Sequence, residues 1–189
     1  MHDAQKLFTT KVKETFRESF VDKIVLDIGS YDINGNNKFL FENCNYTGVD
    51  IIDGDNVDVV SKGHEYDGES ESFDTIISTE CFEHDMYYDK TLKNIVRMLK
   101  PGGLFVFSCG APGRLEHGTL RTTPQDSGVT LTDNKKDPDW EKWQNYYKNL
   151  SESDVKEVLD IESIFKHHKF YYAPPPIADL YFWGVKHGK

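Results

Sequence analysis

Two acidic residues, each near the end of a short apolar stretch, are the features of this sequence that most directly suggest chemistry. Residues 24–28 contain Asp27 and are followed by Gly29, and residues 46–50 end in Asp50. A glycine turn at the tip of one strand lets backbone approach a ligand, and a carboxylate at the next strand accepts hydrogen bonds from ribose hydroxyls. The pattern therefore predicts an open α/β sheet that binds a cofactor built on adenosine.

Hydrophobic periodicity predicts the elements that would position these two acids. We expect helices at 3–20, 38–41, 86–99 and 151–159, and strands at 23–28, 46–50, 56–60, 72–78, 104–108, 163–172 and 179–185. The apolar residues of the helix expected at 86–99 recur with the spacing of a single helix face. The unbroken apolar stretch at 104–108 is typical of a strand that is buried on both faces of a sheet.

The connection between the last two expected strands indicates the topology. It contains Pro174, Pro175 and Pro176 and is too short for a helical crossover, so these strands should pair antiparallel. We therefore predict the α/β class: a Rossmann-like, doubly wound sheet of about seven strands, mostly parallel, with an antiparallel C-terminal hairpin and helices on both faces.

Residues 110–150 differ from the rest of the chain. They contain few aliphatic residues, prolines at 112, 124 and 138, and many polar groups. A structureless loop of this length is uncommon inside a compact domain. We therefore predict one domain over residues 1–189, with a lid-like insertion at about 110–150.

The composition of the chain limits which binding partners and which cellular compartment we expect. The 189 residues carry a formal net charge of −10, which argues against non-specific binding to nucleic acid or to anionic membranes. We see no membrane-spanning run and no secretion signal, and the three cysteines form no disulfide framework. We expect a protein of the reducing cytoplasm, while nothing in the sequence specifies an oligomeric state.

The order and spacing of these motifs resemble the class I S-adenosylmethionine-dependent methyltransferases, and in particular small type 11-like domains. The resemblance covers nearly the whole chain and is carried by residues 25–30, 48–51, 73–78, 82–84 and 98–103. A helix closed by Leu-Lys-Pro-Gly-Gly before an apolar strand is frequent in that family. The resemblance implies S-adenosylmethionine as cofactor and O- or N-methylation, and the small size of the chain favours a small-molecule or saccharide acceptor.

The sequence departs from the family in the loop after the first strand. The family usually continues Asp-x-Gly-x-Gly, but Tyr31 stands two residues after Gly29. Tyrosine lacks the freedom of glycine at positive φ, so we expect the loop to round the methionine moiety differently. Gly35 is the residue we expect to supply the close backbone approach.

The resemblance assigns the cofactor contacts of the first two strands to five residues. Asp27 would help to position the methionine ammonium, directly or through water, while Gly29 and Ser30 would bring backbone close to it. Asp50 would accept hydrogen bonds from both ribose hydroxyls, and Ile51 would pack on the adenine face. The alternative for each acid is a solvated strand end or a helix cap.

Further cofactor contacts are expected after the third and fourth strands. Gly63 and His64 follow the third strand, where the adenine edge lies in the family, although His64 could equally be a surface histidine. Thr79 and Glu80 follow the fourth strand, at the carboxyl edge where such sheets bind ligands.

Four residues are candidates for catalysis and for acceptor binding. His84 is the best placed general base and His117 is its rival, because a near-neutral imidazole can take a proton from a hydroxyl acceptor. Glu83-His84 could instead begin the next helix and pack beneath the cofactor. Arg114 and Arg121 could clamp an anionic or sugar-phosphate acceptor, or belong to a solvated loop. The spacing of His64, Glu80, Glu83 and His84 matches no strong ligand pattern, so we predict no metal site.

Two other classes of function stay open. One is a nicotinamide-dependent oxidoreductase, which the missing Gly-x-Gly-x-x-Gly motif and the terminal hairpin argue against. The other is a non-catalytic partner subunit that binds S-adenosylmethionine, which Tyr31 in the glycine loop leaves open.

Overall fold

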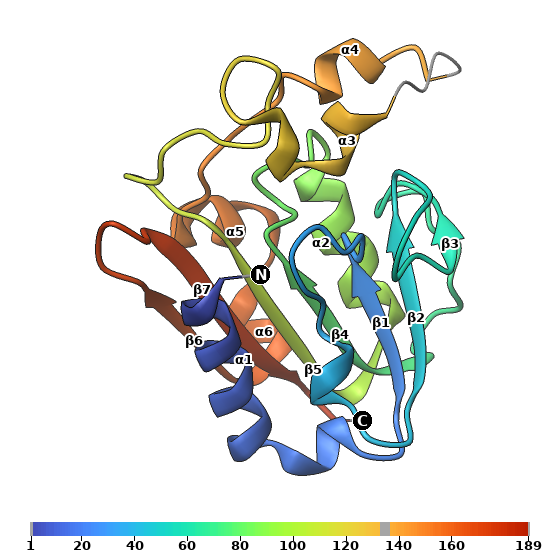
Figure 1. The fold of residues 1–189 in the computed structure, drawn as a ribbon. Coiled ribbons are helices and arrows are strands. Elements are labelled where there is room, and N and C mark those ends of the chain that lie inside the picture. The colour runs from blue at the N-terminus through green and yellow to red at the C-terminus, as the bar shows by residue number, and fades with distance from the viewer. Residues whose placement is uncertain (1, 133–136, 189) are drawn as a thin grey trace.

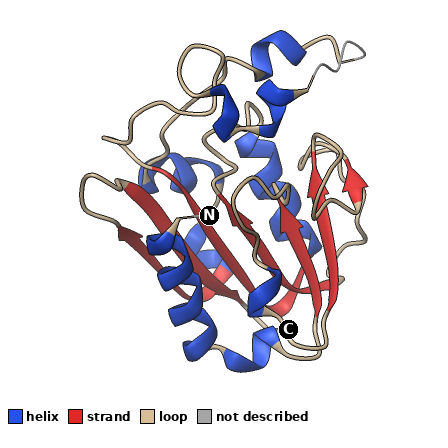
Figure 2. Ribbon diagram, in the orientation of Figure 1, coloured by secondary structure: helices blue, strands red, loops and turns tan. Residues whose placement is uncertain are grey.

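The computed structural model describes residues 2–132 and 137–188, which form one seven-stranded sheet with helices on both faces (Figures 1 and 2). The strand order is β3-β2-β1-β4-β5-β7-β6. The strands are β1 (Ile24–Ile28), β2 (Asn45–Asp50), β3 (Val59–Val60), β4 (Phe73–Thr79), β5 (Leu99–Gly110), β6 (Phe165–Tyr172) and β7 (Asp179–Lys186). Strands β1 to β5 pair parallel and β7 pairs antiparallel with both β5 and β6, which confirms the predicted fold class.

The helices divide between the two faces of the sheet. The α-helices are α1 (Asp3–Thr15), α2 (Tyr88–Met98), α3 (Gly128–Leu131), α4 (Trp140–Trp143), α5 (Glu152–Val158) and α6 (Ile161–Ile164). Short 3-10 helices are η1 (Arg17–Phe20), η2 (Lys38–Leu40) and η3 (Pro124–Asp126). Helix α1 with η1 and η2 covers one face, and α2, α5 and α6 cover the other (Figure 1).

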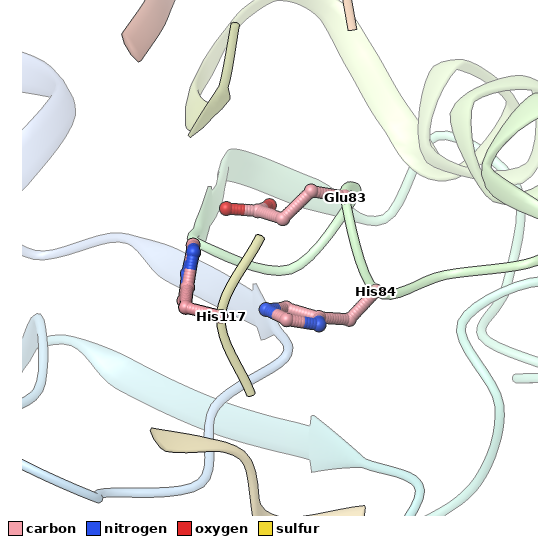
Figure 3. Close-up of side chains that lie close together, drawn as sticks. All are labelled: Glu83, His84 and His117. Atoms are coloured by element: carbon pink, nitrogen blue, oxygen red, sulfur yellow. The ribbon is translucent and has the colours of Figure 1, made fainter. Parts of the chain in front are cut away.

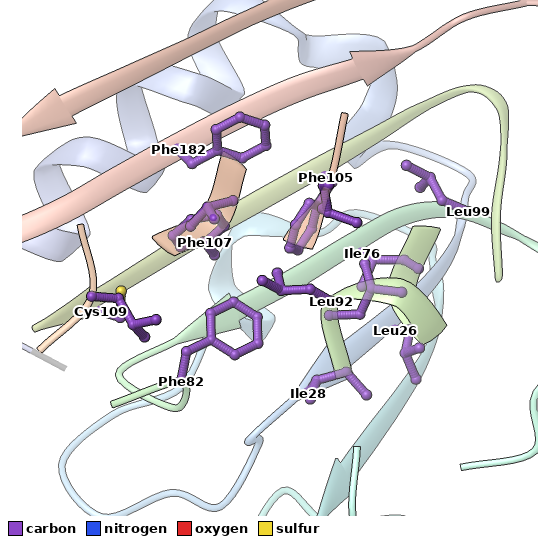
Figure 4. Close-up of a cluster of buried hydrophobic side chains, with 14 of the residues drawn as sticks. Leu26, Ile28, Ile76, Phe82, Leu92, Leu99, Phe105, Phe107, Cys109 and Phe182 are labelled. Atoms are coloured by element: carbon purple, nitrogen blue, oxygen red, sulfur yellow. The ribbon is translucent and has the colours of Figure 1, made fainter. Parts of the chain in front are cut away.

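The core follows the two-residue alternation of the central strands. In β5, Phe105 and Phe107 pack with the residues of α2 and α5, as Figure 4 shows for part of this cluster, while Leu104 and Val106 pack with α1. All four side chains are buried, as expected for a central strand covered on both faces. The predicted continuous apolar strand is therefore confirmed.

Several element boundaries differ from the sequence predictions for local reasons. The helix predicted at 3–20 ends at Phe16, which has non-helical φ and ψ of −123° and 46°, and resumes as η1. The strand predicted at 56–60 keeps only its last two residues, because Asn56 has a φ of 69° and the Asp58 carboxylate accepts a hydrogen bond from the Gly48 N–H at 2.7 Å. The predicted start of β6 is instead helix α6, which Asp160 caps by accepting hydrogen bonds from the backbone N–H and hydroxyl of Ser163.

Strand β5 is longer than predicted. Leu99 pairs with Phe73 directly after helix α2, and Leu104 pairs with Thr75, so residues 100–103 form a bulge within the strand. Helix α2 ends at Met98, and Leu99 is already extended and part of β5, so the Pro-Gly-Gly sequence lies within the bulge of the strand and not at the end of the helix.

Because β1, β2, β4 and β5 are parallel, their carboxyl ends lie at one edge of the sheet. The 110–150 segment, with η3, α3 and α4, lies over that edge (Figure 1). No helix among the described residues has the length and apolar character that a bilayer crossing requires.

Candidate active site

A cleft of about 610 Å³ lies at the carboxyl edge of the sheet, beneath the 110–150 segment. Its walls come from the residues that follow β1, β2 and β4 and from the 110–150 segment, including Gly29, Asp50, Glu80, His117 and Ser127. A cleft of this size holds a small ligand rather than a folded partner.

Gly29 shapes the turn at the tip of β1. Its φ is 78°, a conformation that side chains rarely adopt, and an added Cβ would lie 2.5 Å from Sγ of Cys81. Its N–H donates to the carbonyl of Val49 at 2.9 Å. Only glycine therefore fits where β1 gives way to the loop that lines the cleft.

Asp27 is a buried acid beside this turn. Its side chain is 1% exposed, and Oδ2 accepts hydrogen bonds from the hydroxyl of Tyr46 and from Nδ2 of Asn37, the latter at 3.2 Å. Burial raises the pKa of Asp27 to about 7, although these two donors oppose the shift. Its Oδ1 is buried without a hydrogen-bond partner among the described residues, so it can accept a bond from a ligand in the cleft.

The loop after β1 curves around the cleft. The backbone N–H of Tyr31 donates to Oδ2 of Asp50 at 3.0 Å, and the Ser30 carbonyl accepts from Nδ2 of Asn56 at 2.8 Å. Gly35 has a φ of 119° and lies in the cleft wall, as does Ser30. The loop thus uses Tyr31 through its backbone and Gly35 for the turn that tyrosine resists.

Asp50 lies at the end of β2, adjacent to the tip of β1. Burial raises its pKa to about 6, and backbone N–H groups of Tyr31 and Ile52 donate to its carboxylate at 3.0 and 3.3 Å. Asp50 and Ile51, the predicted ribose acceptor and adenine contact, both line the cleft.

The two residues predicted after β3 differ in their positions. Gly63 lines the cleft, and its carbonyl accepts from Nδ2 of Asn94 at 2.9 Å. His64 is not among the lining residues. Its ring packs against Tyr87 at 4.5 Å between centroids, and burial lowers its pKa. Gly63 therefore lies in the wall of the cleft, whereas the His64 ring lies against Tyr87.

Thr79 and Glu80 both line the cleft where β4 ends. The Thr79 hydroxyl accepts from Nδ2 of Asn37 at 3.1 Å, which links it to Asp27. Glu80 has a φ of 51°, an uncommon conformation for a residue with a side chain, and it turns the chain out of the strand.

Three acids, Glu80, Glu83 and Asp179, gather around one arginine. Arg114 lies 3.6 Å from Oε2 of Glu80 and 3.3 Å from Oδ1 of Asp179, and it donates to the carbonyl of Ile177 at 2.7 Å. Burial raises the pKa of Glu80 well above its ordinary range and that of Glu83 to about 7, and the Asp179 charge adds to both. This side of the cleft therefore holds more acidic than basic groups.

His84 and His117 come together although they are far apart in the sequence. Their ring centroids are 5.1 Å apart, and both rings line the cleft. Burial, with a smaller contribution from His117, lowers the pKa of His84 to about 3, and burial also lowers the pKa of His117. His84 is consequently a weak proton acceptor at neutral pH.

The two predicted arginines do not form one clamp. Arg114 lines the cleft but is engaged by the acids described above. Arg121 is not among the lining residues. Its side chain is 53% exposed and pairs with Glu116 at 2.8 Å.

Sequence reasoning missed three residues that complete the site, which are Asn37, Tyr46 and His2. Asn37 and Tyr46 hold Asp27, and His2 reaches Asp179 at 2.8 Å from the other end of the chain. Trp143 lines the cleft from the 110–150 segment. Asn37 could have been suspected from its place in the loop after β1, but no local pattern marks His2.

Comparison with known proteins agrees with this geometry. A family model described as a methyltransferase domain matches residues 1–161. None of the curated proteins matches the sequence significantly.

Solved structures share the fold at low sequence identity. Phosphoethanolamine N-methyltransferase 2 of Haemonchus contortus, solved with S-adenosyl-L-methionine, is 16% identical with a TM-score of 0.61. The match covers 94% of this chain and 52% of the Haemonchus chain. The chain thus spans about half the length of that enzyme. The 1,6-didemethyltoxoflavin-N1-methyltransferase of Burkholderia thailandensis, with 1,6-didemethyltoxoflavin and S-adenosylhomocysteine bound, is 20% identical with a TM-score of 0.60. The match covers 98% of this chain and 83% of the Burkholderia chain. N-methyltransferase NodS of Bradyrhizobium japonicum is 15% identical with a TM-score of 0.59, and the match covers 98% of this chain and 97% of the NodS chain.

Proposed function

The chain belongs to the methyltransferase domain family and uses S-adenosylmethionine as its cofactor, and from that premise we propose that it methylates a small molecule or a saccharide on oxygen or nitrogen. The observation that carries the proposal is the pair of acids at the tips of the adjacent strands β1 and β2. Asp27 and Asp50 face one cleft, and Asp27 keeps a buried oxygen without a partner among the described residues.

These residues fit the two polar ends of the cofactor. Oδ1 of Asp27 suits the methionine ammonium, and the carboxylate of Asp50, fixed by two backbone donors, suits the ribose hydroxyls. We further propose that Gly29, Ser30 and Gly35 follow the methionine moiety. The bound cofactor supplies an electrophilic methyl group and its own leaving group, so the protein's task is alignment and exclusion of water.

Ile51 and the backbone of Gly63 would frame the adenine, and Thr79 and Glu80 would border the methionine side. His64 has no direct part in this proposal, because its ring is turned against Tyr87.

We propose that the 110–150 segment acts as a lid over the cleft. Val129, Trp140 and Trp143 pack against Ile52 beside the cofactor end, so the segment closes the cleft toward solvent. A roofed cleft favours a small acceptor, and the Burkholderia enzyme, which shares the fold, was solved with one. We also propose a reducing, cytoplasmic setting, since the cysteines are free thiols.

The charges beside the lid favour a neutral or cationic acceptor over an anionic one. Arg114 is engaged by Glu80 and Asp179, which leaves little of its charge for a phosphate. His84 and His117 would border the acceptor. An amine that arrives deprotonated needs no base, whereas a hydroxyl needs help that His84, with its pKa of about 3, supplies poorly.

Calorimetric titration with S-adenosylhomocysteine and with NAD tests the cofactor assignment. We expect saturable binding of the first only, and the reverse result would favour an oxidoreductase. Asp50→Ala should weaken binding about 10- to 100-fold, the loss of hydrogen bonds to a charged group. Asp53→Ala, which removes an exposed acid from the same loop, should leave affinity unchanged.

Incubation with methyl-labelled cofactor and fractionated extracts tests the acceptor class. We expect label in small molecules. Label in RNA or protein alone would contradict the proposal, and cofactor binding without any transfer would favour a non-catalytic partner subunit.

A further inference from the structure

Glu83, His84 and His117 form a cluster of metal-ligating groups that the sequence analysis did not recognise. Each offers one ligand atom, and these atoms all lie within 4.8 Å of one another. Figure 3 shows the carboxylate and the two rings directed toward a common space. Glu83 and His84 follow β4, whereas His117 comes from the 110–150 segment, so the tertiary fold creates the cluster.

Glu83 supplies an oxygen that the described residues leave unpartnered. The residue is 0% exposed, and Oε1 accepts from the backbone N–H of Gly110 at 2.9 Å. Oε2 is buried and has no hydrogen-bond partner among the described residues. Burying a carboxylate oxygen unpaired is costly, which points to a cationic ligand at this position.

The histidines present the chemical form that binds metals. His117 lies with Nδ1 3.2 Å from the carbonyl of Leu115, an acceptor, so Nδ1 carries the proton and Nε2 carries the free lone pair. A ring N–H that donates to a backbone carbonyl is the usual support behind a metal-ligating imidazole. Burial keeps the His84 ring neutral as well.

We propose that Glu83, His84 and His117 bind a divalent transition-metal ion such as Zn²⁺ at the acceptor side of the cleft. Two imidazoles and one carboxylate are a donor set that suits zinc and its neighbours. Metal–ligand distances of about 2.0–2.2 Å bring tetrahedral ligands to roughly 3.4 Å from one another. The spacing of up to 4.8 Å therefore has to shorten by about 1.4 Å at most when an ion binds.

The location gives the ion a possible task. Three protein ligands leave a coordination position open, and two of the three, His84 and His117, line the cleft. An ion held there would be placed to bind an oxygen of the acceptor. It would also join the 110–150 segment to the residues after β4.

A second group, His2, Glu80 and Asp179, also has ligand-like spacing and also holds buried carboxylate oxygens without a hydrogen-bond partner among the described residues, but both of its acids are already paired with charged or ring groups. Nε2 of His2 contacts Asp179 at 2.8 Å, and the guanidinium of Arg114 lies 3.3 Å from the same acid and 3.6 Å from Glu80. A guanidinium in that position repels a metal ion.

Metal binding by the whole chain tests the proposal without any cofactor, so it stands or falls separately from the proposed function. The protein is freed of metal with a chelator and titrated with Zn²⁺, and with Co²⁺ for its ligand-field absorption. We expect one ion per chain and tetrahedral-type Co²⁺ bands. Zn²⁺ should also raise the melting temperature, because the site exists only in the folded state.

Variants locate the ion. Glu83→Gln, His84→Ala and His117→Ala should each weaken Zn²⁺ binding at least tenfold, since even residues behind metal ligands cost about 10- to 100-fold. His167→Ala, at an exposed position of β6, should change nothing. His→Gln replaces any alanine variant whose circular dichroism shows that it does not fold.

Three results would overturn the proposal. They are no stoichiometric binding, unchanged affinity in His117→Ala, and loss of binding in His2→Ala, which would place the ion in the other group. If the buried oxygen of Glu83 instead accepts a hydrogen bond from an amine of the acceptor or from the His117 ring, no stoichiometric metal binding is expected.

Discussion

Gly29 and Gly102 have nearly the same backbone conformation, with φ angles of 78° and 77°, in different surroundings. A Cβ on Gly29 would lie 2.5 Å from Cys81, whereas a Cβ on Gly102 meets nothing within 4 Å. We predict that Gly102→Ala costs about 1 kcal/mol of folding free energy, the penalty of the left-handed conformation. Gly29→Ala should cost roughly 1–3 kcal/mol more, because it also overpacks the tip of β1.

Urea unfolding of the two variants measures this difference. Because the backbone conformation is matched, the excess loss in Gly29→Ala reports the steric contact with Cys81. Equal losses would show that this turn relaxes and that glycine is not required for close packing there.

From the raised pKa of Asp27 we predict that cofactor binding depends on pH. Its folded pKa is raised by burial to about 7, so the stability that its protonated form contributes is present at low pH and is lost as pH rises through 7. Below that pH the carboxyl is neutral and attracts an ammonium weakly. Affinity for S-adenosylhomocysteine should therefore increase from about pH 6 to about pH 8.

Calorimetry across this pH range checks the prediction. Asp27→Asn should flatten the dependence, and any slope that remains should lie lower, where Asp50 titrates with its pKa of about 6. An unchanged profile in Asp27→Asn would mean that another group governs binding.

The sequence identified the residues at strand ends because an acid or a glycine after an apolar stretch is a local pattern. Asp27, Gly29 and Asp50 all line the cleft, as predicted. The cluster of Glu83, His84 and His117 escaped that reasoning, because its third member lies on a segment whose path no local pattern specifies.

At the scale of elements, helix α5 depends on a reciprocal cap. The Ser151 hydroxyl accepts from the Asp154 N–H at 3.3 Å, and the Asp154 carboxylate accepts from the Ser151 N–H at 2.8 Å and pairs with Lys148 at 2.7 Å. Ser151→Ala should cost about 1 kcal/mol of stability, measured by urea unfolding. Glu157→Ala, an exposed change in the same helix, should cost much less.

The same cap has a signature at acidic pH. Hydrogen bonds from Lys148 and Ser151 outweigh burial and lower the pKa of Asp154 to about 2. A lowered folded pKa adds stability that is present above the unfolded value near 4 and is lost as pH falls through about 2. The Ser151→Ala penalty should therefore shrink in that window, and a constant penalty would contradict the coupling.

The hydrophobic periodicity of the sequence predicted which segments are helices and which are strands, but it did not predict where each of them begins and ends. Helix α5, predicted at 151–159, begins within one residue of that range, since its cap by Ser151 and Asp154 is local. Strand β3 is shorter than predicted because Oδ2 of Asp58 accepts from the Gly48 N–H at 2.7 Å, an interaction between separate elements. Such contacts are decided by the tertiary structure and leave no periodic signal.

For the whole molecule, the strand order was predictable in outline, because the short proline-rich connection forces the last two strands to be antiparallel. The position of the 110–150 segment was not. Its tryptophans Trp140 and Trp143 pack against Ile52, a residue about ninety positions earlier, so this contact depends on the completed fold.

One ion pair ties this segment to the loop after β3. Nζ of Lys62 lies 2.8 Å from Oδ2 of Asp137, and the two side chains are only 16% and 9% exposed. Lys62→Met removes the charge from outside the segment and keeps the aliphatic stem. The lost interaction free energy should be about 1–2 kcal/mol, between the values for exposed and buried ion pairs. The loss should weaken the attachment of the 110–150 segment to the loop after β3.

Hydrogen–deuterium exchange of the unliganded protein measures that effect. In Lys62→Met, amides of the 110–150 segment should exchange about 5- to 30-fold faster, the factor that 1–2 kcal/mol represents, while amides of β1 and β4 stay protected. Lys142→Ala breaks the exposed pair with Asp139, in which Lys142 is 73% exposed, and should change exchange little. Equal acceleration in both variants would mean that apolar packing on Ile52, and not the buried ion pair, holds the segment closed.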